Sequence, residues 1–140
     1  MSNCIFCKII NNEIPNVKIY EDDKVVAFLD ISQVTKGHTL VIPKKHVENI
    51  YEVDEITISD LYKRVPKIAK AITKAFNAQG CNIVNNNGEI AGQTVFHYHV
   101  HIIPRYNDDD GFRAIYTNHM DQFSKEDLEK IALIIKKELN

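Results

Sequence analysis

The sequence has little excess charge of either sign and no long hydrophobic run. Its 140 residues include 17 Lys and Arg against 19 Asp and Glu, which gives a formal net charge of -2. Because these charges are spread along the chain, no basic face or tail favours nucleic-acid binding. No run of about eighteen apolar residues occurs, and the first residues form neither a basic leader nor an apolar signal segment. We therefore expect a soluble, cytoplasmic protein that binds neither nucleic acid nor membrane.

Internal repeats, low-complexity tracts and linkers rich in Pro, Gly or Ser are also missing. At 44% hydrophobic and 26% charged, a chain of this length has enough material for one sizeable core. We expect residues 1–140 to form a single domain.

Short β-forming segments make up much of the chain. The expected strands are 17–20, 24–30, 40–42, 81–86 and 95–103. Pro43 and Pro104 follow two of these runs and should end them, since proline cannot continue a central ladder. The turn-like residues 21–23 between the first two runs predict a hairpin.

Two segments have helical periodicity. Apolar residues recur every three or four positions over 56–77, with Gly80 just beyond as a stop, and Pro66 predicts a kink or a break near 63–65. Ser124 and Asp127 form a capping box before a second helix, whose apolar stripe is Leu128, Ile131, Ala132, Ile135 and Leu139. The order predicts an α+β fold, a mostly antiparallel five-stranded sheet covered by one long helix and a C-terminal helix.

Three of the six histidines occupy alternate positions of one expected strand, at His97, His99 and His101. Alternate side chains of a strand share a face, so all three rings should point the same way and grip one phosphate group. Imidazole near neutral pH can act as a nucleophile, a proton carrier or a donor to oxyanions. Two other interpretations stay open: a cluster of partly buried histidines, or a metal site completed by a carboxylate from residues 108–110.

The three cysteines are an odd set, and two of them lie close together. Cys4 and Cys7 have the spacing at which two thiolates bind one tetrahedral zinc, and His46 and His97 are the best candidates to complete the site. A redox pair of the thioredoxin type would need a preceding βαβ unit, which the sequence does not offer before Cys4. Cys81 is expected to be a small buried apolar residue.

The triplet together with the preceding residues 91–95 (AGQTV) resembles the signature of the histidine triad (HIT) superfamily. The segments CIFCKII, FLDI and GHTLVIPKKH are similar to its other landmarks, and place the resemblance in the Hint-like branch. The resemblance implies a nucleotide-binding α+β fold and a homodimer whose sheets join across the interface. It also implies action on purine nucleotides or nucleoside phosphoramidates, or on related phosphoanhydrides.

The resemblance further implies roles for single residues. His99 would attack the α-phosphorus to give a nucleotidyl-histidine that water resolves, and His101 would donate to phosphate oxygens. His38 would support the triad from the neighbouring strand. The zinc would be structural, one per chain, and would orient His97.

The expected substrate contacts come from two regions. Asp30 aligns with the position that binds the ribose hydroxyls, and Asn86 with a polar contact on the phosphate side. Gln93 and Thr94 would donate to phosphate oxygens, and Gly92 would let the backbone approach closely.

Three alternatives to a phosphoramidase remain open at this stage. They are a dinucleoside polyphosphate hydrolase, a nucleotide-binding regulator with little turnover, and a metallohydrolase whose metal is held by the histidine triplet. The leaving group should depend on the segment after Arg105, which carries no motif that we can interpret.

Overall fold

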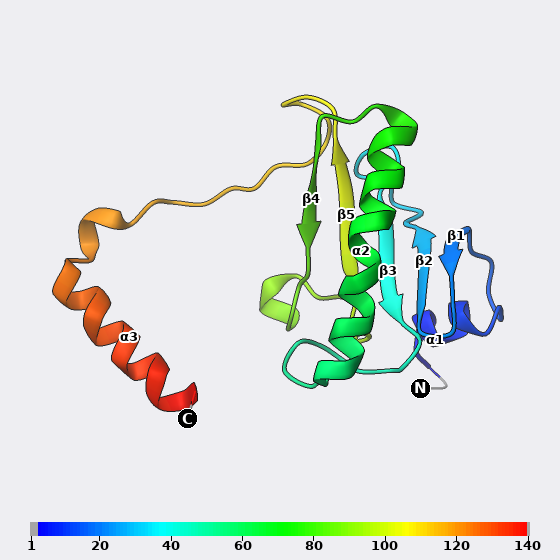
Figure 1. The fold of residues 1–140 in the computed structure, drawn as a ribbon. Helices are drawn as coiled ribbons and strands as arrows, with labels where there is room; N and C mark the ends of the chain where they lie inside the picture. The colour runs from blue at the N-terminus through cyan, green and yellow to red at the C-terminus, as the bar shows by residue number, and fades with distance from the viewer. Residues whose placement is uncertain (1–2, 140) are drawn as a thin grey trace.

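A five-stranded antiparallel sheet lies at the centre of the computed structural model, which describes residues 3–139 (Figure 1). Its strands are β1 (Lys18–Glu21), β2 (Val25–Leu29), β3 (Thr39–Pro43), β4 (Gly80–Val84) and β5 (Val100–Arg105). Their order across the sheet is β1-β2-β3-β5-β4, so that β1 and β4 form the two edges. The predicted α+β class and five-stranded antiparallel sheet are therefore confirmed.

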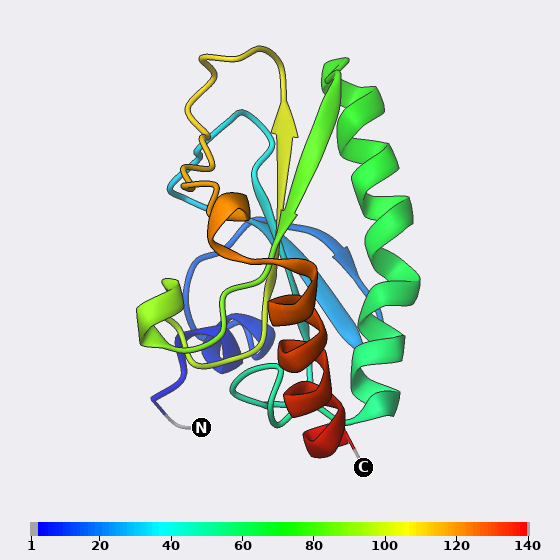
Figure 2. The ribbon, with the colours of Figure 1, turned by 90° about the vertical axis from the view of Figure 1, so that its left-hand side faces the viewer.

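Two helices cover opposite faces of this sheet (Figure 2). The long helix α2 (Glu55–Phe76) packs on one face, and the short helix α1 (Ile5–Ile10) packs on the other. Strand β2 shows why both are needed, since Val25 and Ala27 face α2 while Val26 and Phe28 face α1. The remaining elements are two short 3-10 helices, η1 (Glu89–Ala91) and η2 (Met120–Gln122), and the C-terminal helix α3 (Lys125–Leu139).

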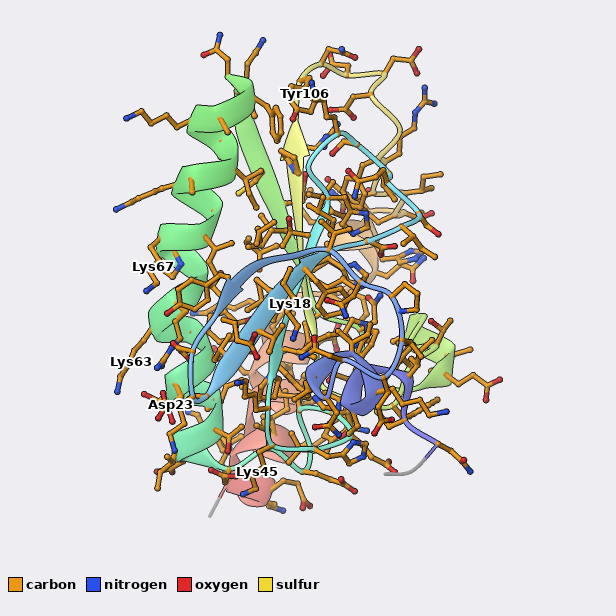
Figure 3. The ribbon with its side chains drawn as sticks, turned by 90° about the vertical axis from the view of Figure 1, so that its right-hand side faces the viewer. Lys18, Asp23, Lys45, Lys63, Lys67 and Tyr106 are labelled. Atoms are coloured by element: carbon orange, nitrogen blue, oxygen red, sulfur yellow. The ribbon has the colours of Figure 1, made fainter. Side chains whose placement is uncertain are left out.

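The hairpin of β1 and β2 is tied to α2 by its turn residue Asp22. The Asp22 carboxylate accepts hydrogen bonds from the Nε of Arg64 and the hydroxyl of Tyr20, both at 2.6 Å. Figure 3 shows this side of the molecule, with Lys18 on β1 and Lys67 on α2 labelled. The turn and the helix are thus held together by a partly buried ion pair.

Helix α2 runs without a break from Glu55 to Phe76, so a break near 63–65 was a wrong prediction. Pro66 lies on the exposed side of the helix. Proline removes one backbone hydrogen bond at this point, while the buried Val65 and Ile68 hold the helix to the sheet. The helix starts at Asp54, whose carboxylate caps the Thr57 N–H at 2.8 Å.

The strand boundaries also differ from those expected, because β4 ends at Val84 and β5 begins only at Val100. Residues 95–97 form bends, and the Tyr98 N–H donates to the Val47 carbonyl, outside the sheet. Strand β5 then continues through Pro104. The Pro104 carbonyl accepts a hydrogen bond from the Thr35 hydroxyl. The nitrogen and the carbonyl of one strand residue point to the same side, so the Pro104 nitrogen also faces the β3 side. The pairing of β3 with β5 has already ended there, at Thr39 and Ile102, and no N–H is needed.

Cys81 is exposed, contrary to expectation, because it lies on the edge strand β4. Among residues 3–139, no helix combines the length and the apolar character needed to cross a bilayer.

The C-terminal helix has the predicted cap but does not cover the sheet. The Ser124 N–H donates to Asp127 at 2.9 Å and the Asp127 N–H donates to Ser124 at 3.1 Å, which confirms the capping box. Figure 1 shows α3 standing apart from the sheet at the end of an extended segment. The expectation that it packs on its own sheet is wrong.

Candidate active site

The histidine triplet lies on the α1 side of the sheet. Tyr98, Val100 and Ile102 point the other way into the core under α2, so the predicted alternation holds although only part of the segment is strand. The rings of His99 and His101 are neighbours, with centroids 5.1 Å apart. His97 is fully buried and does not reach the same cavity. The expectation that all three rings grip one phosphate is therefore wrong for His97.

A single hydrogen bond fixes the tautomer of His99. Its Nδ1–H donates to the backbone carbonyl of His97 at 2.7 Å. The other nitrogen, Nε2, is then left with an unprotonated lone pair. Burial lowers the pKa of His99, which keeps the ring neutral. The edge of the Phe6 ring packs against it, with ring centroids 5.0 Å apart.

His101 is oriented by a chain of contacts that ends in the backbone. The Val34 N–H donates to His38 Nδ1 at 3.3 Å, so His38 carries its proton on Nε2. That Nε2–H lies 2.9 Å from His101 Nδ1, which accepts it and leaves His101 Nε2 as a donor. Burial lowers the pKa of His101 to about 4, so the ring is neutral at pH 7. Asp30 Oδ2 lies 3.6 Å from His38 Nε2. Burial lowers the pKa of His38, so this ring is also neutral at pH 7.

His99 and His101 open into a pocket of about 360 Å³. Its other lining residues are Phe6, Asp30, Ser32, Leu40, Asn86, Gly92, Thr94 and Val95. The structure thus brings four of the five expected substrate contacts together around the two rings. Gly92 has a φ of 92°, a conformation that residues with a side chain rarely adopt.

Gln93 is the exception among the expected substrate contacts. Its amide donates to the carbonyls of Glu48 and Val95 and accepts from the Gly88 N–H, and the side chain is buried. These bonds tie the loop that carries Gly92 and Thr94 to Glu48 in another loop. Gln93 does not line the pocket, and its expected contact with phosphate stays a prediction.

Cys4, Cys7, His46 and His97 form a second cluster next to the pocket. Cys4 Sγ lies 3.5 Å from His97 Nδ1, Cys7 Sγ lies 3.4 Å from His46 Nδ1, and the two Nδ1 atoms are 3.2 Å apart. Bond lengths for a tetrahedral zinc place its nitrogen and sulfur ligands roughly 3.3 to 3.8 Å from one another. The four residues could therefore hold one metal ion.

The protonation pattern of the cluster agrees with a metal site. His97 Nε2–H donates to the Pro43 carbonyl at 2.8 Å, which leaves Nδ1 unprotonated on the side of the two sulfurs. Burial raises the pKa of the Cys7 thiol to about 11, and a neighbouring cation would offset the cost of ionising it. Cys4 is the N-cap of α1, and within residues 3–139 no strand precedes the pair.

Asn85 is a site residue that the sequence did not single out. Its amide donates to the His99 carbonyl at 2.9 Å, and its oxygen accepts from Asn87. The run of three asparagines after β4 was the available signal, but spacing alone could not show which of them supports the histidine.

The fold and the site define a small α+β protein with a paired-histidine pocket beside a cysteine-histidine cluster. A family model described as HIT domain matches residues 11–108. The chain belongs to the HIT family, which confirms the resemblance found in the sequence.

Relatives in other organisms extend over most of the chain. Protein hit of Bacillus subtilis is 58% identical over 98% of this chain and 94% of its own length. Adenosine 5'-monophosphoramidase hnt1 of Schizosaccharomyces pombe is 44% identical over 78% of this chain and 79% of its own. Adenylylsulfatase HINT3 of Arabidopsis thaliana is 43% identical over 77% of this chain and 55% of its own. The family therefore contains nucleotide hydrolases.

Solved structures match the fold closely. A HIT family protein from Bacillus anthracis has a TM-score of 0.94 at 54% identity, covering 99% of this chain and 98% of its own. A protein from Streptococcus mutans has a TM-score of 0.94 at 51% identity, covering 100% and 87%. A Zn-bound histidine triad family protein from Mycobacterium smegmatis has a TM-score of 0.75 at 36% identity, covering 86% and 87%.

Proposed function

We propose that the protein cleaves nucleoside 5'-phosphoramidates, or related phosphoanhydrides, at the α-phosphate through a nucleotidyl-histidine at His99. The observation that carries the proposal is the hydrogen bond from His99 Nδ1–H to the His97 carbonyl. It leaves the Nε2 lone pair of a neutral ring at the pocket, as a nucleophile requires. The relative named as an adenosine 5'-monophosphoramidase supports the same substrate class, with a purine as the expected base.

The proposed reaction has two balanced steps. In the first, His99 Nε2 forms a bond to the α-phosphorus as the bond to the leaving nitrogen breaks; that nitrogen enters protonated and leaves with the electron pair as a neutral amine, while His101 Nε2–H donates a hydrogen bond to the phosphoryl group. In the second, a water oxygen attacks phosphorus and gives up a proton to solvent, and the bond from phosphorus to His99 breaks, which returns the ring to its neutral form. The products are the amine and the nucleoside monophosphate.

The pocket residues divide the remaining work in this proposal. Asp30, whose carboxylate lines the pocket, accepts hydrogen bonds from the ribose hydroxyls. Asn86 and Thr94 donate to the phosphate oxygens, where negative charge gathers in the transition state. The Gly92 backbone lies close to these oxygens, and His38 keeps His101 in the tautomer that donates.

We also propose that Cys4, Cys7, His46 and His97 bind one structural zinc per chain. The ligand distances and the Zn-bound relative from Mycobacterium smegmatis support this. The ion would stabilise the fold around His97 and take no part in the chemistry. A metallohydrolase with the triplet as ligands is disfavoured, because His97 faces the cysteines while His101 faces His38 and Asp30.

Hydrolysis of an adenosine phosphoramidate tests the reaction, with mass spectrometry of the protein after a brief mix. Wild type should turn over and gain the mass of a nucleotidyl group on His99, and His99→Asn should do neither. His119→Asn, which changes a histidine of the distant C-terminal segment, is the matched control and should behave as wild type. A wild type that binds nucleotide without product or added mass would instead favour a nucleotide-binding regulator.

Leaving-group preference separates the related activities. A dinucleoside polyphosphate hydrolase, or an activity like that of the adenylylsulfatase relative, releases an oxygen leaving group in place of an amine. Comparison of kcat/KM for the phosphoramidate, a diadenosine polyphosphate and adenylyl sulfate would show which substrate the site prefers. We further propose a cytoplasmic homodimer as the active form.

A further inference from the structure

The loop after β5, residues 106–112, is fixed in place by a carboxylate at its centre. Asp110 accepts hydrogen bonds from the Arg105 Nε at 2.9 Å and from the Tyr106 N–H at 2.8 Å. Only 5% of the Asp110 side chain is exposed. Hydrogen bonds to an ionised group are among the stronger ones in proteins. This Asp110 loop is therefore a firm support for the residues that it contacts.

The Asp110 loop lies against a second loop, residues 30–38, which connects β2 to β3 and ends at His38. The Tyr106 hydroxyl donates to the Lys36 carbonyl, and Figure 3 labels Tyr106 at this end of the molecule. The Thr35 hydroxyl donates to the Pro104 carbonyl at 2.6 Å. Two consecutive residues of this His38 loop are thus bonded to the end of β5 and to the residue that follows it.

Gly111 makes the closest approach between the two loops. Its φ is 113°, a conformation that residues with a side chain rarely adopt. A Cβ at this position would overlap the carbonyl oxygen of Val34. Because Asp110 fixes the loop that carries Gly111, a side chain here would displace Val34.

Val34 is the residue that sets the tautomer of His38. Its N–H donates to His38 Nδ1 at 3.3 Å, and His38 Nε2–H then donates to His101. A distance of 3.3 Å is long for an N–H donor, so a small shift of Val34 breaks this bond. His38 would then be free to carry its proton on Nδ1 and to accept from His101 Nδ1–H. In that arrangement His101 Nε2 presents a lone pair to the pocket in place of an N–H.

We infer that Gly111 is a positioning residue for the pair His38 and His101. Its close approach to Val34 holds the Val34 N–H against His38, and thereby keeps His101 as the donor to the phosphoryl group. Asp30 supports the same tautomer from the other side of the ring, because its carboxylate lies 3.6 Å from His38 Nε2. The inference rests on the proposed reaction for the effect of Gly111 on the rate, but not for its effect on the tautomer.

Gly111→Ala tests the inference, with nitrogen NMR of the folded protein to identify which ring nitrogen carries the proton. In wild type, His38 and His101 should both be protonated on Nε2. In the variant, His101 should be protonated wholly or partly on Nδ1. For an adenosine phosphoramidate, kcat should fall about tenfold or more, because one donor to a developing oxyanion supplies about a hundred- to a thousandfold. KM should change less than about threefold, since the ribose and base contacts are intact.

Two further variants separate positioning from a general loss of stability. Tyr106→Phe removes the bond to Lys36 without straining the backbone, and should move the His101 proton in the same direction by a smaller amount. Asp109→Ala changes an exposed residue of the Asp110 loop and is the matched control, which should keep the tautomers and kcat of wild type.

Two results would overturn the role of Gly111. One is a folded Gly111→Ala variant whose His101 is still protonated on Nε2, and the other is a shifted proton with unchanged kcat. A wild type without turnover would instead overturn the proposed reaction. The NMR comparison of wild type with Gly111→Ala would still show whether Gly111 sets the tautomer of His101.

Discussion

The backbone carbonyl of His97 accepts the Nδ1–H of His99 at 2.7 Å, while the ring of His97 belongs to the cysteine-histidine cluster. One residue therefore connects the proposed metal site to the proposed nucleophile. Phe6 makes a second connection, because it lies in the helix that Cys4 caps and packs its ring edge on His99. Two contacts of His99 thus come from residues that belong to the cysteine-histidine cluster or lie next to it.

Removal of the metal should weaken the fold and the chemistry together. Chelation, or Cys7→Ser, should lower the melting temperature and slow formation of the His99 adduct by about ten- to a hundredfold, the effect typical of lost supporting contacts around a metal site. Thermal unfolding and the rate of mass gain measure the two effects. Cys81→Ser, at an exposed cysteine of β4, should change neither. Lost catalysis with an unchanged melting temperature would instead indicate a catalytic metal.

Asp30 should matter only for substrates that carry ribose hydroxyls. Asp30→Asn keeps an oxygen for the Ser32 N–H, which Asp30 Oδ1 accepts at 2.8 Å, but it removes the carboxylate charge. We expect KM for an adenosine phosphoramidate to rise about tenfold, as for the loss of one hydrogen bond to a charged group. KM for the 2',3'-dideoxy analogue should stay unchanged. Equal increases for both substrates would mean that Asp30 acts by another route.

The sequence predicted which residues form the site better than it predicted what each of them contacts. Alternation along residues 97–101 correctly placed Tyr98 in the core and the histidines on the other face. The sequence offered His97 both as a phosphate contact and as a partner of the cysteines, and could not decide between the two, because the ring is turned by a hydrogen bond to Pro43, which is far away in sequence and close in the fold. The bond between Gln93 and Glu48 could not be predicted for the same reason, since Glu48 comes from a distant loop.

The errors in the predicted fold also come from contacts between residues that are far apart in the sequence. Proline rules treat a strand or helix in isolation. Pro66 lies on the exposed side of a helix whose buried side holds it to the sheet, and Pro104 lies beyond the last residue pair of β3 and β5. The apolar stripe of α3 was recognised correctly. A pattern along one chain, however, cannot tell a helix that packs on its own sheet from one that packs elsewhere.

Stability should fall as the solution is acidified from pH 7 toward pH 4. Burial lowers the pKa of His101 to about 4, and the neighbouring His99 and His38 add to this effect while Asp30 opposes it. The unfolded chain, in which the histidine titrates near 6.5, therefore binds more protons in this window. One such group contributes at most about 1.4 kcal/mol per pH unit. Urea unfolding of wild type and His101→Gln should show a shallower loss for the variant, and equal slopes would contradict the assignment.

Asp22 should be among the largest polar contributors to stability. Its carboxylate accepts from the N–H groups of Lys24 and Val25 at 2.8 and 2.9 Å, besides Tyr20 and Arg64, and these partners hold its pKa well below the usual range. Asp22→Ala leaves the Arg64 guanidinium with only the more distant Asp60 carboxylate, at 3.7 Å, and leaves the N–H groups of Lys24 and Val25 without their acceptor. It should lower the free energy of unfolding by about 2 to 3 kcal/mol. The neighbouring Asp23→Ala is the matched control, since Asp23 is exposed, and should change it by less than about 0.5 kcal/mol.

Because β1 and the turn lie far from the pocket, the adduct rate of Asp22→Ala should equal that of wild type at temperatures where the variant is folded. A slower adduct rate in the folded variant would mean that the hairpin and the histidine pocket are coupled through the sheet.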